Sequence, residues 1–390
     1  MTDMAAATTA ATGRRTSWWR DDASEPVRRN LGLVGVLVLL YFVGTLARPD
    51  IFLNGHRLWN NELTVLTQAS SIGVVTVGMT IVMIAGGIDL SVGALLALAS
   101  VWSTTVATQS YGPGIMIFTA LLVGAVAGLI NGILIAYGRL VPFIATLAMM
   151  VAARGLAEKI SGKLTQLVHV RTINEIAESR PLGIPLLVII FVVVAALAWV
   201  LLNRTTFGRR TVAVGGNPEA ARLAGINVRR HTLLIYTLSG LCCGIAAVMV
   251  TAQATAGSSD HGNLYELNAI AAAIIGGTAL TGGRGTIVGS VLGVLVFTQI
   301  YNLFIVKNLQ TEYQQIAQGV IIVGAVLIQQ FRVAALRRPS FGGSPPKSSG
   351  MPDDTGPPHT SEGSPPAAVA EQRMADSSTV AAPPKSTSAG

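Results

Sequence analysis

Ten long apolar runs dominate this sequence and constrain what it can fold into. A helix needs about 20 predominantly apolar residues to cross a bilayer, where only helices and closed barrels satisfy their backbone polar groups. Charged residues make up 12% of the chain, about half the share in typical soluble domains. The sequence therefore predicts an all-α fold, a polytopic transmembrane bundle of about ten helices. The apolar runs are 31–47, 63–85, 88–107, 112–137, 140–157, 182–202, 232–256, 266–280, 286–305 and 314–331.

Glycine is frequent within this apolar background. The chain has 42 glycines, and small residues let transmembrane helices approach one another closely. The run 266–280 is too short to span a bilayer, so a half-helix or a loop buried in protein is expected there.

The basic residues are distributed as in a membrane protein. Loop 203–231 has six Lys or Arg residues, whereas loop 257–265 has none. Lys and Arg are enriched in cytoplasmic loops, so with ten helices the chain starts and ends in the cytoplasm. The net charge of +8 is explained in this way, and no nucleic-acid partner is expected. We predict a multi-pass protein of the cell membrane, surrounded by lipid.

Composition divides the chain into three parts. Residues 1–30 are polar and form a cytoplasmic N-terminal segment; Arg-Pro-Asp follows the first apolar run, where a signal peptide would have small residues. Residues 31–332 form the transmembrane domain. Residues 333–390 are rich in Pro and Ser and nearly lack aromatic residues, so a disordered tail is expected.

Enzyme chemistry finds no support in the sequence. There is no phosphate-binding G-x-x-x-x-G-K-[ST] loop, so any ATP hydrolysis belongs to another subunit. The two cysteines, Cys242 and Cys243, are adjacent within an apolar run, and the five histidines are scattered. We expect no metal site and no cofactor on this chain.

One glycine motif, G-G-x-x-L-[ST]-x-G, occurs twice, at residues 86–93 and 276–283. Paired glycine-interrupted segments in two halves of a transporter indicate a repeated unit along the transport pathway. The alternative is coincidence in a glycine-rich chain. Asp89 is read as the N-terminal cap of a restarted helix, with a proton-coupling acid as the alternative. The structural residues of the motif are Gly86, Gly87, Asp89, Ser91, Gly93, Gly276, Gly277, Gly282 and Gly283.

The large polar loop 203–231 predicts a short capped helix. Asn217 accepts from exposed backbone N–H groups, Pro218 suits the first helical position, and Gly225 closes the helix in a left-handed conformation. A capped surface helix between two spans is a docking element, and a solvated connector is the alternative. The candidate residues are Asn217, Pro218, Glu219, Ala220, Ala221, Arg222 and Gly225.

A few polar side chains interrupt the apolar runs and are candidates for a transport pathway. The runs hold few ionisable groups besides Asp89, Arg154 and Glu266, which favours a neutral solute over an ion. Polar groups here also serve as hydrogen bonds between helices, which is the alternative role. The candidate pathway residues are Asn131, Phe143, Thr146, Gln253 and Gln299.

The loop sequence Glu219-Ala220-Ala221, with Gly225 and then Ile235, resembles the EAA loop of importer permeases. The usual Leu-Pro of that motif is missing, and Thr237-Leu238 lies near its place. Over residues 31–332 the chain resembles the ribose/xylose/fructose-type sugar permease family. This wider resemblance rests on Gly78-Met79-Thr80, the motif 86–93, Asn131-Gly132, Pro142 to Leu147, Arg154-Gly155, and Ala271 to Gly285.

The resemblance implies a transporter made of several subunits. It would comprise two copies of this permease, two cytoplasmic ATP-binding-cassette ATPases, and an extracytoplasmic binding protein that delivers a small neutral sugar. The loop helix around residues 217–225 would couple the permease to the ATPase. A non-sugar solute, such as a branched-chain amino acid, a nucleoside or a cyclic polyol, and an ion-coupled secondary transporter remain the alternatives.

Overall fold

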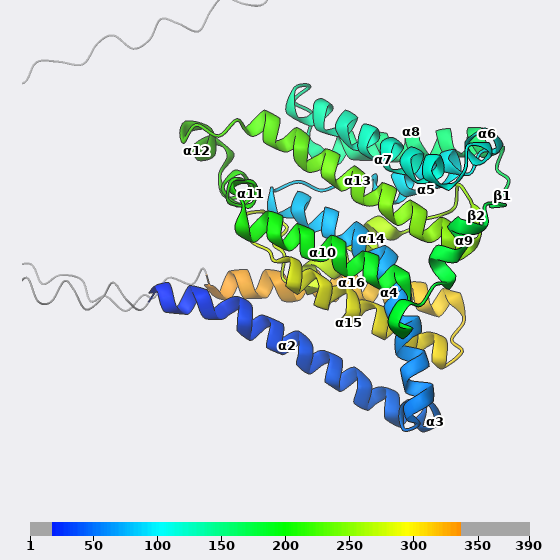
Figure 1. Cartoon of the computed structure of the whole chain (residues 1–390). Coiled ribbons are helices and arrows are strands. Elements are labelled where there is room, and N and C mark those ends of the chain that lie inside the picture. The colour runs from blue at the N-terminus through cyan, green and yellow to red at the C-terminus, as the bar shows by residue number, and fades with distance from the viewer. Residues whose placement is uncertain (1–17, 337–390) are drawn as a thin grey trace, which may run out of the picture. The chain divides into compact units, whose positions relative to one another are not determined.

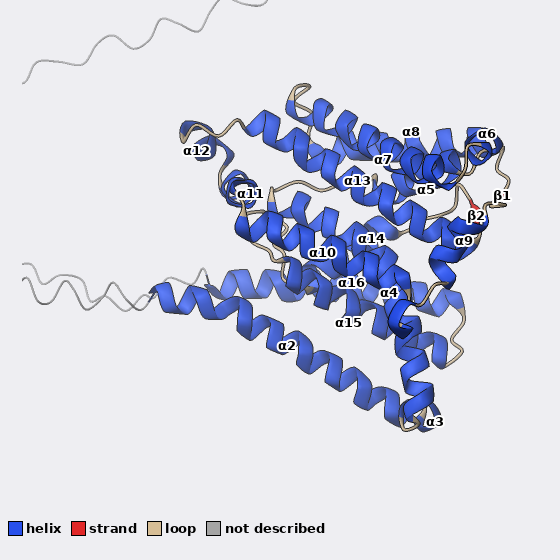
Figure 2. Cartoon of the chain, viewed as in Figure 1, coloured by secondary structure: helices blue, strands red, loops and turns tan. Residues whose placement is uncertain are grey.

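The computed structural model describes residues 18–336, so the predicted tail, 333–390, lies almost entirely outside the described residues. The described part consists of helices joined by loops, with one short ladder in which β1 (Gln166–Leu167) pairs with β2 (Ala256–Gly257) in antiparallel fashion (Figure 2). The prediction of an all-α bundle is confirmed.

Each of the ten predicted apolar runs lies mainly on one long or medium-length helix of the structure. The corresponding helices are α2 (Trp18–Ala47), α4 (Gly55–Ile84), α5 (Val92–Ser103), α7 (Pro113–Ala136), α8 (Pro142–Ser161), α10 (Leu186–Arg204), α13 (Val228–Ala254), α14 (Tyr265–Ile275), α15 (Ile287–Val306) and α16 (Thr311–Leu336). Short helices lie in the connections: α3 (Pro49–Phe52), α6 (Val106–Ser110), α9 (Arg171–Glu178), η1 (Pro181–Gly183), α11 (Thr206–Gly216) and α12 (Pro218–Leu223).

The ten helices differ in length. Within residues 18–336, six are long and apolar enough to cross a membrane. By contrast, α14 has only 11 residues and α5 only 12, so both are half-helices. The sequence predicted a half-helix at 266–280, which is α14. It did not predict one at 88–107, where α5 is shorter than the apolar run because the chain makes a turn before Val92. Helix α2 begins at Trp18, upstream of the apolar run, since extending an existing helix costs little.

The core of the bundle is built on α4 and α13. Every residue of α4 from Gly73 to Ile84 is buried, and α13 packs against α4, α5 and α7. Helices α7 and α13 approach so closely that a Cβ built on Gly124 would lie 2.3 Å from the carbonyl oxygen of Gly240. Glycine is therefore required at this crossing, as in tightly packed transmembrane helices.

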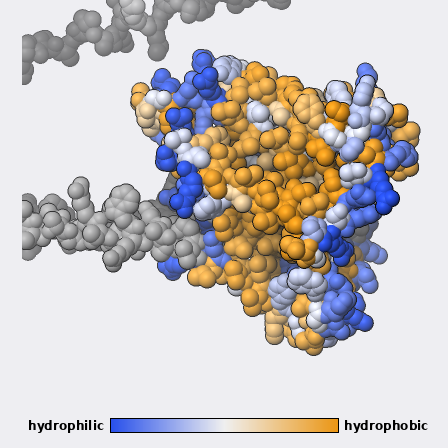
Figure 3. Space-filling view, viewed as in Figure 1, coloured by the Kyte–Doolittle hydropathy of each residue, from blue (hydrophilic) through white to orange (hydrophobic). Residues whose placement is uncertain are grey.

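The two ends of the bundle carry different elements. Helices α11 and α12 lie at one end, and α6, α9 and the β1–β2 ladder lie at the other (Figure 1). Between these ends, hydrophobic side chains cover the visible face, and hydrophilic ones gather toward the ends (Figure 3). Exposed Phe42 on α2, Phe118 on α7 and Val192 on α10 belong to the apolar surface. A band of this kind matches the hydrocarbon core of a bilayer.

Candidate functional site

The loop between α10 and α13 contains the helix that the sequence predicts. Asn217 is the N-cap of α12, and its side chain accepts from the N–H groups of Glu219 and Ala220, at 3.0 Å each. Gly225 follows the helix with φ +81°, and Ile226 N–H donates to the carbonyl of Ala221 at 3.0 Å. This six-to-one bond with a left-handed glycine is a Schellman closure. Both ends of this six-residue helix are therefore locally fixed.

The surface of α12 is open to a partner. Ala221 is buried against the bundle, whereas Leu223 is 81% exposed. Glu219 and Arg222 form an exposed ion pair, with 2.9 Å between Arg222 Nη2 and Glu219 Oε2. Exposed ion pairs contribute little stability, so these charges are free to serve recognition. The assignment of residues 217–225 to ATPase coupling stays a prediction.

The first glycine motif forms a sharp break between α4 and α5, held by one buried carboxylate. Asp89 Oδ1 accepts from the backbone N–H and the hydroxyl of Ser91, at 3.1 and 2.5 Å. Its other oxygen accepts from Ser239 Oγ of α13 at 3.0 Å. The N-cap of α5 is Ser91 and not Asp89, which corrects the expectation from the sequence. Asp89 instead accepts from the N–H of Ser91 and so holds the turn that precedes the helix.

Two of the predicted pathway residues are bound to this break. Asn131 of α7 donates to Ser91 Oγ at 2.9 Å, and Thr146 of α8 contacts the carbonyl of Ile88 at 3.3 Å. Both side chains are fully buried. This geometry corresponds to the hydrogen bonding between helices that the sequence left as an alternative, and a role in transport stays a prediction.

The second glycine motif forms a longer break, residues 276–286, between α14 and α15. Arg29 of α2 donates to the carbonyl of Gly277 and to Thr286 Oγ1, at 3.2 Å each. Thr286 in turn caps α15 by accepting from Gly289 N–H at 3.1 Å. The sequence did not predict the contact with Arg29, because 248 residues separate Arg29 from Gly277.

The other three predicted pathway residues are scattered. Phe143 is half-exposed in the first turn of α8. Gln253 lies in the last turn of α13 and donates to the carbonyl of Thr67 on α4 at 3.2 Å. Gln299 of α15 is buried. The structure therefore brings Asn131 and Thr146 to one break but does not gather the five candidates into one site.

A polar cluster that the sequence analysis missed lies at the end of the bundle opposite α12. Arg154 of α8 donates to the carbonyls of Ser259 and His261, and His261 Nδ1 lies 3.0 Å from Ser100 Oγ, which pairs with Thr251 Oγ1 at 2.8 Å. Burial lowers the pKa of His261, so its imidazole is neutral at pH 7. From the sequence, only Arg154 stands out, as a charged residue in an apolar run. The rest of the cluster consists of loop carbonyls and hydroxyls, whose positions follow no recognisable spacing.

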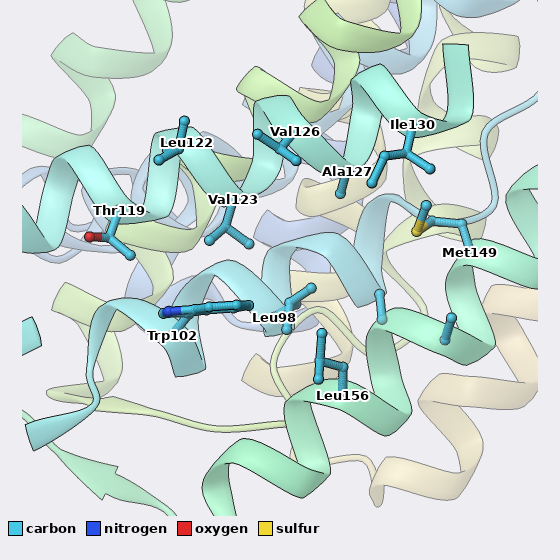
Figure 4. Close-up of a pocket in the computed structure, with 12 residues that line it drawn as sticks. Leu98, Trp102, Thr119, Leu122, Val123, Val126, Ala127, Ile130, Met149 and Leu156 are labelled. Carbon is cyan, nitrogen blue, oxygen red and sulfur yellow. The ribbon is translucent and has the colours of Figure 1, made fainter. Parts of the chain in front are cut away.

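An apolar groove lies between α5, α7 and α8 (Figure 4). Its volume is about 530 Å³, and it offers few polar groups for a hydroxylated solute. The groove is therefore a poor sugar site, and none of the predicted pathway residues lines it. The lining residues are Leu98, Trp102, Thr119, Leu122, Val123, Val126, Ala127, Ile130, Met149, Ala152, Ala153 and Leu156. Within residues 18–336, no group of three or more His, Cys, Asp or Glu side chains could hold a metal ion.

Comparison with known proteins agrees with this architecture. Residues 61–326 match the family described as the permease component of the branched-chain amino acid transport system. The chain is 36% identical over 302 residues to the ribose import permease of Escherichia coli K12, covering 76% of this chain and 92% of the relative. It is 40% identical over 276 residues to the ribose import permease of Bacillus subtilis 168, covering 70% and 86%.

A third relative is the galactofuranose transporter permease of Escherichia coli K12, 34% identical over 324 residues, which cover 81% of this chain and 95% of the relative. No solved structure matches the chain. The family match covers well over half of the chain, and it includes the loop helix and both glycine breaks. The chain is therefore a multi-pass membrane protein that belongs to the family of transport-system permease components.

Proposed function

We propose that this chain is the membrane-spanning permease subunit of an ATP-driven importer for a small neutral sugar. The observation that carries the proposal is α12, a capped and exposed helix between two long helices, in a chain whose relatives are named as ribose and galactofuranose permeases. A rigid helix at the end of a bundle can transmit the motion of a docked subunit to the bundle as a rigid-body movement.

The partners follow from this role. ATP hydrolysis takes place on separate ATPase subunits, which dock on α12 at the cytoplasmic end of the bundle. The basic loop 203–231 favours this orientation, with both termini in the cytoplasm. A binding protein delivers the sugar at the opposite end. The chain itself carries no cofactor.

The functional unit contains two copies of this chain. One chain presents one α12, whereas a pair of ATPases has two docking grooves. Native mass measurement of the purified complex should therefore give two permeases and two ATPases. A stable complex with one copy and a different permease would contradict the homodimer but leave the ATP-driven importer intact.

A neutral solute fits the chemistry of the described residues. Asp89 is fully buried and hydrogen-bonded to serines, and Arg154 is bound to loop carbonyls, so neither is positioned as a free charge for an ion. The solute is identified by titrating the purified binding protein with D-ribose, D-galactose, L-arabinose, leucine, adenosine and myo-inositol. Binding of leucine, adenosine or myo-inositol alone would replace the sugar with one of the alternative solutes.

The coupling role of α12 is tested by substitutions at its end. Gly225 has φ +81°, and a β-branched residue is strained there by about 1–2 kcal/mol. Nothing lies within 4 Å of a Cβ at this position, so strain rather than collision is introduced. We expect Gly225→Val to reach the membrane in normal amounts, to copurify with less ATPase and to take up little sugar. Glu219→Lys should act in the same direction but more mildly.

Gly225→Asn is the matched control, because Asn tolerates the left-handed conformation. It should retain both ATPase association and uptake. If Gly225→Val and Glu219→Lys both behave as wild type, α12 is only a connector. Uptake that follows a proton gradient at constant ATP would instead favour a secondary transporter.

A further inference from the structure

The last turn of α11, directly before the loop helix, lies where the two glycine breaks meet. A Cβ built on Gly215 would lie 1.8 Å from the carbonyl oxygen of Ile84, at the end of α4, and 2.7 Å from the backbone nitrogen of Gly283, in the second break. Real Cβ atoms do not approach other atoms so closely. Gly215 is therefore in backbone contact with both breaks at once.

The two breaks are also bonded to each other at this point. The N–H of Gly283 donates to the carbonyl of Ile84 at 2.8 Å. A Cβ on Gly282 would lie 2.8 Å from the Cα of Gly86 and 2.7 Å from the carbonyl oxygen of Gly215. Three segments that are far apart in the sequence thus meet through main-chain atoms at this point.

Such a contact is stiff. Protein interiors are close-packed and transmit strain, and main-chain atoms cannot change rotamer to absorb a displacement as side chains can. Only Asn217 separates α11 from α12. A displacement of α12 that moves α11 must therefore also move the end of α4 and the turn at Gly282 and Gly283.

We propose that Gly215 is the positioning residue through which movement of α12 reaches both glycine breaks. This inference rests on the proposed function, because α12 must first be the element that the ATPase moves. It assigns a role to the repeated motif: its two copies are the elements that the coupling loop displaces, one in each half of the bundle. The half-helices α5 and α14 adjoin these breaks, so the displacement is passed into the bundle.

The adjacent glycine supplies a matched control. A Cβ on Gly216 would meet nothing within 4 Å, and Gly216 is not left-handed. Gly215→Ala forces main-chain atoms apart, whereas Gly216→Ala adds the same methyl group one residue away into open space. Both variants leave residues 217–225, the predicted ATPase-binding segment, unchanged.

The experiment uses the full complex with its ATPases in proteoliposomes. Exposed Thr281, in the second break, and half-buried Ala85, beside the first, are replaced singly by cysteine and labelled with a maleimide, with and without a non-hydrolysable ATP analogue. In the parent protein the analogue should change the labelling rate at both positions. The native cysteines are buried and slow to react.

Gly215→Ala should still copurify with the ATPase but lose the nucleotide dependence of labelling at both positions, together with ATP-driven sugar uptake. Gly216→Ala should keep both. A merely structural glycine would lower the amount of assembled complex and leave the nucleotide dependence of that complex unchanged, which would overturn the proposal.

Labelling and uptake measured on the parent complex test the proposal even if Gly215→Ala fails to assemble. A labelling change at only one of the two breaks, or at neither, would overturn the shared junction while ATP-driven uptake by the parent remains. Absence of ATP-driven uptake of the identified sugar by the parent complex would instead overturn the proposed function.

Discussion

The two copies of the glycine motif form breaks of different construction. The first is short: α5 restarts at Val92, and Gly93 is already within the helix. In the second, the equivalent Gly283 is left-handed at φ +74°, and α15 does not start until Ile287. The leading Gly-Gly pair also differs: its first glycine, Gly86, is left-handed in one copy, and its second glycine, Gly277, is left-handed in the other.

Two differences in sequence accompany this difference in structure, one at Asp89 and one at Val92, whose place Gly282 takes in the second copy. Asp89 accepts from the N–H of Ser91 and so supports an immediate helix start, whereas Ala279 occupies the equivalent place in the second copy. Without a carboxylate, the chain continues as a turn, with Ala279 N–H bonded to the carbonyl of Arg284 at 2.9 Å. The helix then starts at the next available cap, Thr286. The second copy thus lacks the hydrogen-bond acceptor of Asp89, and it also has a left-handed glycine, Gly282 at φ +82°, where the first copy begins its helix.

The largest effect should come from removing the acceptor of the first break. In Asp89→Leu, the N–H and hydroxyl of Ser91 and the hydroxyl of Ser239 all lose their acceptor in a fully buried place. An unsatisfied buried group costs about 1–3 kcal/mol, so we expect a loss of about 3 kcal/mol or more in unfolding free energy. Thermal unfolding of the purified protein and its yield from membranes measure this loss.

Asp89→Asn is the control for charge. Its amide oxygen can accept from Ser91, and the hydroxyl of Ser239 can rotate to accept from the amide N–H. We expect nearly normal stability and transport. Wild-type stability of the Leu variant would contradict the structural role, and loss of transport in a normally assembled Asn variant would make Asp89 part of the transport chemistry.

A smaller effect is expected at the second break. Arg29→Met keeps an unbranched, flexible side chain, two atoms shorter, but removes the bonds to Gly277 and Thr286, at a cost of about 1–3 kcal/mol. Amide hydrogen exchange should speed up most over residues 276–286 and less over 85–91, where the bond between Gly283 and Ile84 passes on part of the effect. Arg28→Met changes the exposed neighbour and should stay within about 0.5 kcal/mol of wild type. Equal effects of the two variants would mean that Arg29 does not hold the break.

Local patterns sufficed to predict most elements of this fold. The apolar runs indicated ten helices, and Asn217 with Gly225 indicated both ends of α12, because spans and caps depend on neighbouring residues. The repeated motif also indicated where two of the helix breaks lie.

Contacts between distant segments could not be predicted in this way. Ser239 reaches Asp89 across 150 residues, and neither Arg29 nor Gly215 carries a sequence pattern that indicates its partners. The same limit explains why the roles of the pathway candidates could not be predicted from the sequence. Asn131 and Thr146 were recognised as polar residues in apolar runs, but periodicity does not tell whether a polar side chain contacts a solute or a neighbouring helix.

Removing one buried hydroxyl at each break compares the two breaks directly, and the hydroxyl at the second break has the smallest predicted effect. Ser239→Ala removes a donor to a carboxylate, and such bonds contribute about 1.5–3 kcal/mol, against about 0.5–1.5 kcal/mol between neutral groups. At the second break, Thr80 Oγ1 lies 2.8 Å from Ser290 Oγ, and Ser290 also has Thr278 Oγ1 at 3.3 Å. Thr80→Val should therefore cost less, about 1 kcal/mol or below.

The double variant tests whether the two breaks are energetically independent. The changes in unfolding free energy caused by substitutions at distant, independent sites add to within about 0.5 kcal/mol. These breaks, however, share the bond between Gly283 and Ile84. Thr80 lies one helical turn before Ile84 on α4. We expect the unfolding free energy of Ser239→Ala/Thr80→Val to depart from additivity by more than this margin. Strict additivity in thermal and denaturant unfolding would mean that each break is stabilised on its own, and that their contact at Gly215 transmits little energy between them.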